Sequence, residues 1–456
     1  MFKKVLIANR GEIAVRIIRA CRELGIHTVT VYSTADKHAL HAKIADEAVC
    51  IGPAATKDSY LNAAAIIEAC KMTGAEAVHP GFGFLSENAD FAELCLKNNI
   101  VFIGPRPESI RMLGDKAAAK ETMKAAGVPV IPGSDGAVPD MEAAKKLCKE
   151  IGCPLMVKAS AGGGGRGIRL VEHPEDLEAA ITAAKQEALN FFGNDEVYME
   201  KFIVNPKHIE VQILADSYGN TVYLGERDCS MQRRNQKVLE EAPSPASFMN
   251  EELRAKMGKA ACTAAKVCGY RNAGTIEFLV DKNGEFYFME MNTRIQVEHP
   301  ITEAVTGVDL VKQQLLIASG QRLSIKQEDI KLTGHAIECR INAENPLLDF
   351  RPSPGRIKSL FIPGGPGIRV DTAVYQGYEI PPYYDSMIGK LIVHGKNREE
   401  AIAKMTWALS EFIVDGVATN VDFQLKLIRR PEFLEGNYDN GFLNRTDILA
   451  DERSKE

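Results

Sequence analysis

In the stretch FYFMEMNTRIQVEHP, residues 286–300, polar and charged residues occupy alternate positions and could together bind a charged ligand. In an extended strand, every second side chain points to the same face. One face would then carry Phe286, Phe288, Glu290, Asn292, Arg294, Gln296 and Glu298. An arginine offers a planar fork to an anion, and carboxylates suit a hard metal ion. The stretch therefore predicts a site for an anionic, metal-bound ligand, with an ordinary solvated strand face as the alternative.

A second carboxylate joins this face if the preceding hairpin has a favoured turn. The Asn-Gly pair at 283–284 predicts a two-residue type I′ turn, and the resulting register places Glu277 directly opposite Glu290. Their Cβ atoms would be about 5 Å apart, a distance at which like charges destabilise a sheet. With the amide oxygen of Asn292, two such carboxylates suit a magnesium ion. A solvated, mildly repulsive pair remains the alternative.

Residues 158–170, KASAGGGGRGIRL, contain a glycine-rich segment. The sequence holds no G-x-x-x-x-G-K-[ST] motif, and a strand rather than a helix follows the glycines, so this is not a P-loop. A glycine-rich hairpin tip can still fold its backbone N–H groups over phosphates and act as a lid. Lys158, at the end of the preceding strand, would reach the same phosphates. A flexible surface turn is the alternative.

Basic residues gather in the stretch ERDCSMQRRNQKVLEEAP, residues 226–243. Arg233, Arg234 and Lys237 would attract an anion if they lay beside the strand with the carboxylates. Taken singly, each is more simply explained as part of a solvated loop. His208, on a neighbouring predicted hairpin, could join the same group.

The elements that must position these residues follow from hydrophobic periodicity. Near the N-terminus, short β-rich runs alternate with helical stretches, which predicts a doubly wound parallel sheet. The predicted strands are 3–9, 27–33 and 99–104, and the predicted helices are 11–24, 60–74 and 88–99. The first turn, ANRGE, lacks G-x-G-x-x-G, which argues against dinucleotide binding.

A new region begins at a helix that Asp115 would cap. Hairpins dominate it, and a Pro/Gly-rich α+β region follows them. Four segments are therefore expected: an N-terminal Rossmann-like domain at 1–114; a central domain at 115–330 with a mobile lid at about 131–203; a C-terminal domain at 331–446; and a frayed tail at 447–456.

Composition restricts the class of protein. A length of 456 residues suggests about three domains. The formal net charge of −6 argues against nucleic acid as the main partner. No apolar run approaches the roughly 18 residues of a membrane span, and the start MFKKVLIANRG does not resemble a signal peptide. Ten cysteines without CxxC pairs suggest reduced thiols and a cytoplasmic protein.

Several motifs, in order, resemble the ATP-grasp fold. They are GDK with Lys116, Lys158 before GGGGRG, MEKFI, KHIEVQ, MQRRNQK, TIEFL and FMEMNTRIQVEHPITE. The resemblance is strongest to the biotin carboxylase family, the ATP-dependent component of biotin-dependent carboxylases. IANRGEIA and HPGFGFLSEN are similar to that family's N-terminal domain, and YDSMIGKLI is similar to its C-terminal domain. The resemblance covers nearly the whole chain.

The resemblance implies roles for particular residues. ATP would be held by Lys116, Lys158, Gly164, Gly165, Glu200, Lys201, Ile203, His208, Asn235, Glu277 and Glu290. Magnesium or manganese would be bound by Glu277, Glu290 and Asn292, in agreement with the register. Bicarbonate would contact Lys237, Arg294 and Val297, biotin would contact Phe82 and Arg340, and Glu298 would be the base. Arg294, Glu298, Lys237 and Arg340 form the implied catalytic set.

Two positions depart from the family pattern. Phe82 stands where a tyrosine is usual near the biotin pocket, and Asn235 stands where a histidine is usual near the nucleotide. The first departure removes a hydroxyl, and the second removes an imidazole. Apart from the resemblance, the simplest role for Arg340 in ECRINAE is a structural salt bridge.

The implied activity is ATP- and bicarbonate-dependent carboxylation of biotin through carboxyphosphate, as in acetyl-CoA carboxylase. The chain lacks a Met-Lys-Met biotin acceptor, so a separate biotin carboxyl carrier protein and a carboxyltransferase component are expected. A homodimer is expected through helix 12–24, where Arg19 and Glu23 are spaced i,i+4. The alternatives are a subunit of a pyruvate or other 2-oxo-acid carboxylase, another ATP-grasp ligase, or a non-catalytic nucleotide-binding module. Arg294 and Glu298 argue against the last two.

Overall fold

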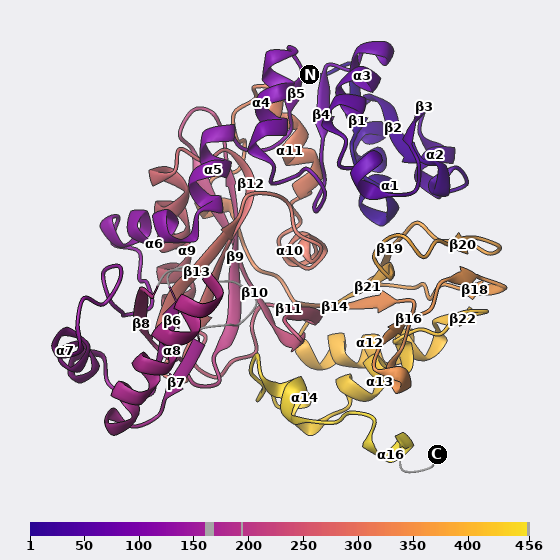
Figure 1. Cartoon of the computed structure of the whole chain (residues 1–456). Coiled ribbons are helices and arrows are strands. Elements are labelled where there is room, and N and C mark those ends of the chain that lie inside the picture. Colours follow the sequence, from indigo (N-terminus) through magenta and orange to yellow (C-terminus); the bar gives the residue numbers. More distant parts are fainter. Residues whose placement is uncertain (160–167, 193–194, 454–456) are drawn as a thin grey trace.

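The computed structural model describes residues 1–159, 168–192 and 195–453, and Figure 1 shows its arrangement. The N-terminal part contains a five-stranded parallel sheet of order β3-β2-β1-β4-β5, which confirms the predicted doubly wound topology. Its strands are β1 (Lys4–Ile7), β2 (His27–Ser33), β3 (Glu47–Gly52), β4 (Ala77–His79) and β5 (Val101–Phe102). Its helices are α1 (Gly11–Glu23), α2 (Leu40–Ile44), α3 (Ala63–Thr73), α4 (Ala89–Lys97) and α5 (Pro107–Gly114).

Local sequence explains these elements. Buried strands of a parallel sheet are apolar on both faces, and Val5, Leu6 and Ile7 of β1 are fully buried. The side chains of Asn62 and Asn88 cap α3 and α4 by accepting from backbone N–H groups. The sequence missed β3, whose residues alternate only weakly, and β4, which has three residues.

A smaller antiparallel sheet of order β7-β6-β8 carries the predicted glycine-rich hairpin. Its elements are α7 (Met141–Ile151), β6 (Leu155–Ala159), β7 (Ile168–Val171), α8 (Leu177–Phe192) and β8 (Val197–Lys201). They lie to one side of the molecule in Figure 1. The predicted phosphate contacts Gly164 and Gly165 lie outside the described residues. Ahead of this sheet, Asp115 caps α6 (Lys116–Ala125) as predicted, with Oδ1 accepting from Ala118 N at 3.1 Å.

The site lies on an eight-stranded sheet of order β13-β12-β9-β10-β11-β14-β21-β19. Its strands are β9 (Lys207–Ala215), β10 (Thr221–Arg233), β11 (Gln236–Ala242), β12 (Asn272–Val280), β13 (Phe286–Asn292), β14 (His335–Asn342), β19 (Ile368–Thr372) and β21 (Met387–Gly395). Helices α9 (Glu251–Val267), α10 (His299–Thr306) and α11 (Leu310–Ala318) lie beside it. Because β11 pairs with β14, the sheet runs through the expected boundary at 330 without a break. The division into domains remains a prediction.

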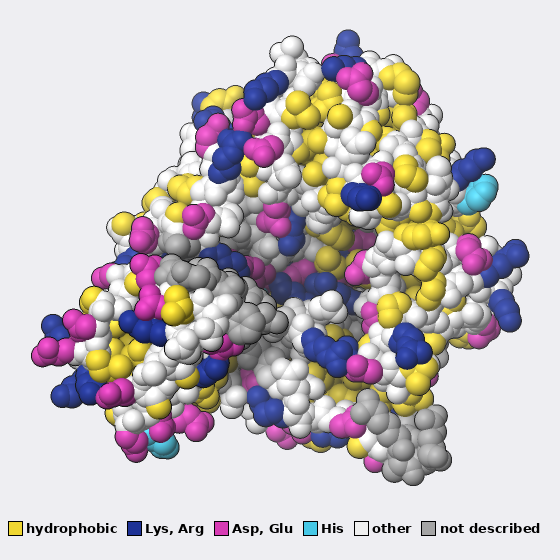
Figure 2. All heavy atoms as spheres, in the orientation of Figure 1, with side chains coloured by type: hydrophobic (Ala, Val, Ile, Leu, Met, Phe, Trp, Pro, Cys, Tyr) yellow, Lys and Arg dark blue, Asp and Glu magenta, His cyan; other side chains and the backbone are white. Residues whose placement is uncertain are grey.

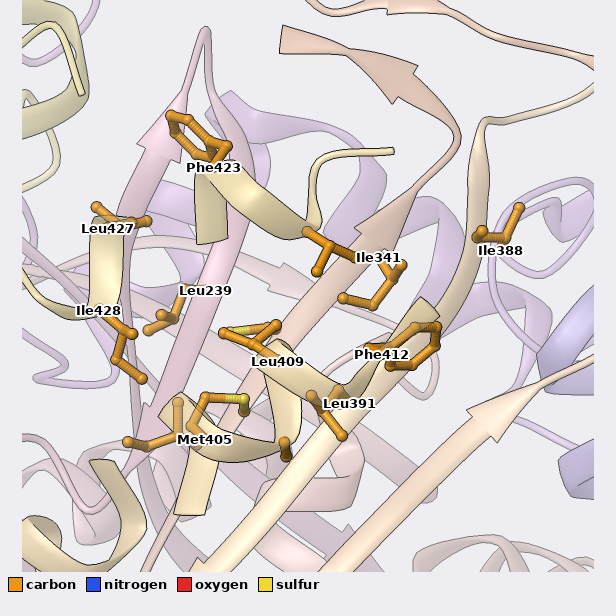
Figure 3. Packing of buried hydrophobic residues seen from close by; sticks show 14 of the residues in the cluster. Leu239, Ile341, Ile388, Leu391, Met405, Leu409, Phe412, Phe423, Leu427 and Ile428 are labelled. Carbon is orange, nitrogen blue, oxygen red and sulfur yellow. The ribbon is translucent and has the colours of Figure 1, made fainter. Parts of the chain in front are cut away.

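In the strands β11, β14, β21 and β19, apolar side chains lie on one face of the sheet and charged side chains lie on the other. One face is apolar: Leu239, Ile341 and Leu391 pack with α12 (Arg398–Glu411) and α13 (Val421–Ile428) in the cluster drawn in Figure 3. The opposite face carries charged residues at alternate positions, namely Glu240, Glu338, Arg340, Lys390, Arg369 and Asp371. α10 packs against β14 and β21. The charged face is therefore the one that contributes to the site.

The hairpin of β12 and β13 confirms the predicted pairing of Glu277 with Glu290, but its turn and register differ from the predicted ones. The turn has three residues, 282–284, ending in Gly284 at a φ of 83°, and not the predicted two. A bulge beside Glu277 shifts the register back by one residue. The bulge also reverses the faces, so Phe286 and Phe288 pack in the core and do not share a face with Glu290.

The remaining C-terminal elements complete the fold. They are the short strands β15 (Glu344–Asn345), β16 (Arg351–Pro352), β17 (Gly355–Arg356), β18 (Ser359–Phe361), β20 (Glu379–Ile380) and β22 (Ile413–Asp415), and the helices α14 (Pro431–Leu434), α15 (Phe442–Arg445) and α16 (Ala450–Arg453). Within the expected tail at 447–456, residues 450–453 form α16 and Leu449 is buried, and the extent of fraying stays a prediction. Among the described helices, none is both long and apolar enough to cross a membrane.

Candidate active site

A groove of about 560 Å³ opens on the large sheet, and Figure 2 shows a hollow there with acidic and basic side chains gathered in it. The structure brings many of the predicted site residues to this groove. They are Lys116, His208, Asn235, Lys237, Glu277, Glu290, Asn292, Arg294, Val297, Glu298 and Arg340. They come from α6, β9, β11, β12, β13, β14 and the segment 293–298, so distant parts of the chain build one site.

Lys237 lies at the centre of the groove and holds three carboxylates. Its Nζ donates to Glu210 at 2.6 Å, to Glu277 at 3.0 Å and to Glu298 at 2.6 Å. Burial opposes the charge of this lysine, yet Cys229 and the carboxylates around it raise the pKa of Lys237 well above its usual value. The ammonium group is a fixed cation that an anionic substrate would meet.

Glu298 is buried between two cations. Its Oε1 accepts from Lys237, and its Oε2 accepts from Arg340 Nη2 at 3.0 Å. Burial alone would raise the pKa of Glu298, but the charges of Lys237, Arg340 and Arg227 lower it well below the usual value. The side chain is therefore an ionised carboxylate, and its basicity depends on how firmly these cations hold it.

The predicted metal ligands line the groove, and other groups of the protein bind their oxygens. Glu277 accepts from Asn292 Nδ2 at 2.8 Å and from Lys237, while Glu290 lies 2.9 Å from Lys116 Nζ. The Asn292 oxygen accepts from Arg294 at 2.9 Å. Two carboxylates and an amide oxygen, facing one another across β12 and β13, are hard donors that fit a magnesium ion.

Two other acidic groups converge without suggesting a further metal. His208, Glu210 and Glu277 form one, and Glu210, Cys229 and Glu298 form the other. Lys237 donates to all three of these carboxylates, and Arg227 and Arg340 pair with two of them, Glu210 and Glu298, so cations of the protein already offset their charge. These clusters are explained by the cations between them.

Arg294 is oriented by a residue that the sequence did not single out. Its Nε donates to Glu87 Oε2 at 2.9 Å, and Glu87 also accepts from the backbone N–H of Thr293 at 3.0 Å. Glu87 lies in the HPGFGFLSEN motif of the N-terminal part. The presence of a carboxylate in that motif was the available signal, but no periodicity places it beside Arg294.

Arg227 is a second missed residue, fully buried beneath the groove. Its guanidinium donates to Gln212 at 2.8 Å and to Gln296 at 2.6 Å, and it forms an ion pair with Glu210. Gln296 donates in turn to Glu277 at 2.9 Å. The network fixes the floor of the site, and nothing in the local sequence GERD distinguishes this arginine from a surface one.

Some predicted residues do not line the groove. Lys158 of β6 pairs with Glu200 of β8, and Lys201 and Ile203 continue the same segment. Phe82 packs against the N-terminal core, where its carbonyl accepts from Asn9 Nδ2 at 2.7 Å. The structure thus places these five residues at or beyond the margins of the groove.

Asn235 fits the backbone it occupies. Arg234 and Asn235 form the two-residue turn between β10 and β11, with φ values of 50° and 64°. Such a turn requires positive φ at both residues, and asparagine is among the residues that tolerate it best. The departure from histidine is therefore compatible with the turn geometry.

Arg340 is anchored by a second buried carboxylate. Its Nε donates to Glu240 Oε1 at 2.6 Å, and Glu240 faces Glu338 across β11 and β14. Burial, together with the nearby charge of Glu298, raises the pKa of Glu240 to about 7, although Arg340 and Lys237 oppose the shift. Burial also raises the pKa of Glu338 well above its usual value.

The raised pKa of Glu240 predicts a pH-dependent stability. The folded protein binds this proton more tightly than the unfolded chain does, so the contribution is full below pH 4.5 and is lost as pH rises through 7. We expect the free energy of unfolding of the wild type, relative to Glu240→Gln, to fall over that range by about 3 kcal/mol. Urea denaturation of both proteins at a series of pH values measures this, and parallel curves would contradict it.

Comparisons with known proteins agree along the whole chain. Three family models match: "Biotin carboxylase, N-terminal domain" at residues 1–110, "Carbamoyl-phosphate synthase L chain, ATP binding domain" at 115–326, and "Biotin carboxylase C-terminal domain" at 338–445. Biotin carboxylase 1 of Bacillus subtilis is 59% identical over 99% of this chain and 100% of its own length.

Two solved structures extend the comparison. A complex of Campylobacter jejuni biotin carboxylase with β,γ-ATP is 53% identical, with a TM-score of 0.88, over 98% of this chain and 99% of that one. The biotin carboxylase domain dimer of Hydrogenobacter thermophilus 2-oxoglutarate carboxylase, in complex with MgADP, ADP and bicarbonate, is 52% identical. Its TM-score is 0.86, over 97% of each chain.

Proposed function

Because the chain belongs to the biotin carboxylase family and therefore carboxylates biotin in an ATP-dependent reaction, we propose that this groove carries the reaction in two steps. Bicarbonate is first phosphorylated by ATP to carboxyphosphate. Biotin, held by a separate carrier protein, is then carboxylated. The observation that carries this assignment is the position of Glu298 between Lys237 and Arg340, because the proposed base for bicarbonate then lies against the arginine proposed to contact biotin.

Bicarbonate activation follows from the charges around Glu298. An anion that binds Lys237 and Arg294 neutralises part of the positive field that keeps the pKa of Glu298 low. Glu298 then becomes a better base and removes the bicarbonate proton. The resulting oxyanion attacks the γ-phosphate of ATP, which gives carboxyphosphate and ADP.

Phosphoryl transfer depends on position and on neutralising charge. Lys116 lies beside Glu290 at one end of the groove, and His208 lies beside Glu277. Magnesium, when bound, would be held by Glu277, Glu290 and Asn292, and it would supply neutralisation of phosphate charge. Lys158, with Glu200 on the neighbouring strand, would contact the nucleotide from the side of the small sheet.

In the second step, carboxyphosphate breaks down to carbon dioxide and phosphate, and the phosphate deprotonates the biotin ureido nitrogen. The negative charge that develops on the ureido oxygen needs a fixed donor. Arg340, held by Glu240 through Nε and by Glu298 through Nη2, lines the groove and would be that donor. The N1 nitrogen of biotin then attacks carbon dioxide.

The test of this assignment is whether ATP hydrolysis depends on bicarbonate and is stimulated by free biotin. Another ATP-grasp ligase would hydrolyse ATP with a different acceptor, and a nucleotide-binding module would not hydrolyse it. The purified chain should contain no covalent biotin and should not carboxylate an acyl-CoA by itself. Release of ADP at full rate in bicarbonate-free buffer would overturn the proposal.

Glu290→Gln is expected to affect magnesium dependence much more than stability. The amide relieves the repulsion between Glu290 and Glu277 but removes a charged metal ligand. The magnesium concentration needed for half-maximal ATP hydrolysis should rise tenfold or more. A titration of activity against magnesium, with thermal unfolding measured in parallel, checks this. Wild-type activity at low magnesium would mean that Glu290 is not a ligand.

The proposed partners are a second copy of the chain, a biotin carboxyl carrier protein and a carboxyltransferase component. The dimeric state of the 2-oxoglutarate carboxylase domain supports the first of these. We propose acetyl-CoA as the eventual acceptor and the cytoplasm as the location, which ten free cysteines suit.

The dimer gives its own prediction. Of the two residues of α1 expected at the dimer interface, Glu23 pairs with Lys312 of α11 in the same chain. Arg19 remains exposed on the same helix, available to a second subunit. We expect sedimentation to show a dimer at micromolar concentration and Arg19→Glu to shift it toward monomer. A wild-type monomer under these conditions would contradict the proposal.

A further inference from the structure

Lys390 is a buried lysine that the reaction described above does not use. Its side chain has no exposed surface, and it lies on the charged face of β21. In the sheet it is directly opposite Arg340 on one side and Asp371 on the other. Burying an ammonium group is costly unless it is paired and hydrogen-bonded, so its partners show what it does.

Those partners belong to the other two parts of the chain. Nζ donates to the backbone carbonyl of Val297 at 2.7 Å. It also lies 3.2 Å from the carboxylate of Glu12, on α1 of the N-terminal part. Neither oxygen of Glu12 has a hydrogen bond among the described residues, so the ion pair with Lys390 is what compensates this buried charge.

Against the effect of burial, two further carboxylates, Glu338 and Asp371, raise the pKa of Lys390 through their charge. Asp371 is bound by Arg369 at 2.6 Å, and Arg369 also donates to Glu303 at 2.7 Å. Arg16 on α1 donates to Glu303 at 2.9 Å. These groups form their own network beside the lysine.

The carbonyl of Val297 belongs to the peptide unit that joins it to Glu298. Fixing this carbonyl fixes the plane of that peptide and therefore the starting point of the Glu298 side chain. Glu298 reaches Lys237 and Arg340 from that point at 2.6 and 3.0 Å. The segment 293–298 lies outside the named strands, so the Val297 carbonyl has no partner in a strand ladder, and Lys390 supplies the donor to it.

We propose that Lys390 is a positioning residue: it holds the Val297–Glu298 peptide so that bicarbonate meets the base at the correct distance. Glu12 supplies the counter-charge that lets this lysine be buried. The inference rests on the proposed roles of Val297 and Glu298. It adds that the bicarbonate site forms only when all three parts of the chain are in place.

The test uses Lys390→Met in a Glu12→Gln background, so that Glu12 is not left as an unpaired buried charge. Glu12→Gln alone is the matched control, because it keeps the bond from Lys390 to Val297. We expect this control to lose stability, because Lys390 then lacks the counter-charge of Glu12, but to keep its kinetic constants within a few-fold of the wild type, because the bond to Val297 remains. In the double variant, the KM for bicarbonate should rise tenfold or more and kcat should fall about a hundredfold, since small misplacement of a reacting group has effects of that size. The KM for ATP should change less than twofold.

Folding is checked by circular dichroism and thermal unfolding. A folded double variant with the kinetic constants of the control would overturn the inference and leave Lys390 as an ion-pair residue. If that variant does not fold, Lys390→Leu in the same background, which also lacks a donor, is measured by the same criteria. Glu298→Gln is measured alongside. Full activity of Glu298→Gln would refute the proposed function, whereas an unaffected double variant beside an inactive Glu298→Gln refutes the inference alone.

Discussion

Glu298→Gln is expected to lose bicarbonate-dependent ADP release and biotin carboxylation together, by a factor of about 10² to 10⁴. The amide has nearly the same shape as the carboxylate, but its nitrogen cannot accept, so it keeps at most one of the hydrogen bonds from Lys237 and Arg340. It cannot accept the bicarbonate proton, so no attacking oxyanion forms. Steady-state assays of ADP release with bicarbonate, with and without free biotin, measure both losses.

Glu338→Gln is the matched control for this substitution. Glu338 is also a buried glutamate on the charged face, two residues from Arg340, and burial raises its pKa well above the usual value. Glu338 does not line the groove, and neither of its oxygens has a hydrogen bond among the described residues, so the amide removes no contact of the site and activity should stay within a few-fold of the wild type. Equal losses in Glu298→Gln and Glu338→Gln would mean that both substitutions disturb the charged face of the sheet, and not that Glu298 is the base.

Arg340→Ala is expected to separate the two steps. Biotin-dependent turnover should fall a hundredfold or more, because the donor to the developing ureido oxyanion is lost. The slow bicarbonate-dependent release of ADP should continue within about tenfold of the wild type, since Lys237 still holds Glu298 through Oε1. ADP release measured with and without biotin gives both rates from one preparation.

The substitution also leaves Glu240 without its partner, so Arg340→Ala is made with and without Glu240→Gln. Arg254→Ala serves as the control, because Arg254 makes two bonds to Glu226, at 2.6 and 2.9 Å, and does not line the groove. It should leave both rates unchanged. If Arg340→Ala slows both steps by the same factor, its role is to hold Glu298 and not to stabilise the biotin oxyanion.

The β12–β13 hairpin shows how far sequence reasoning reaches. Turn propensity and the period of two predicted the correct facing carboxylates, Glu277 and Glu290. Two errors in the prediction offset each other. The turn is one residue longer than predicted, and an unpredicted bulge shifts the pairing by one residue in the opposite sense. Periodicity alone does not reveal a bulge. A strict period of two places Phe286 and Phe288 on the same face as Glu290, whereas the bulge turns them into the core.

Contacts between distant segments were harder to predict for a different reason. Periodicity assigns a residue to a face but does not say which strands become neighbours. The pairing of β11 with β14 brings Arg340 to Glu240 and Glu298, so the arginine is both a structural ion pair and a groove residue. From the sequence alone, the structural role and the role in the site could be predicted only as alternatives for Arg340. Glu87 and Arg227 were missed for the same reason.

The face-sorted sheet described above also constrains which sequence changes this chain can accept. In β14, apolar Ile337, Cys339 and Ile341 alternate with Glu338 and Arg340. Inserting or deleting one residue there would exchange the two sets, driving the charges into the helix-covered core and apolar groups into the site. Single substitutions leave the alternation intact. In β14, an insertion or deletion should therefore be far more damaging than a substitution. The hairpin of β12 and β13 differs, because its bulge compensates for the extra residue in its turn.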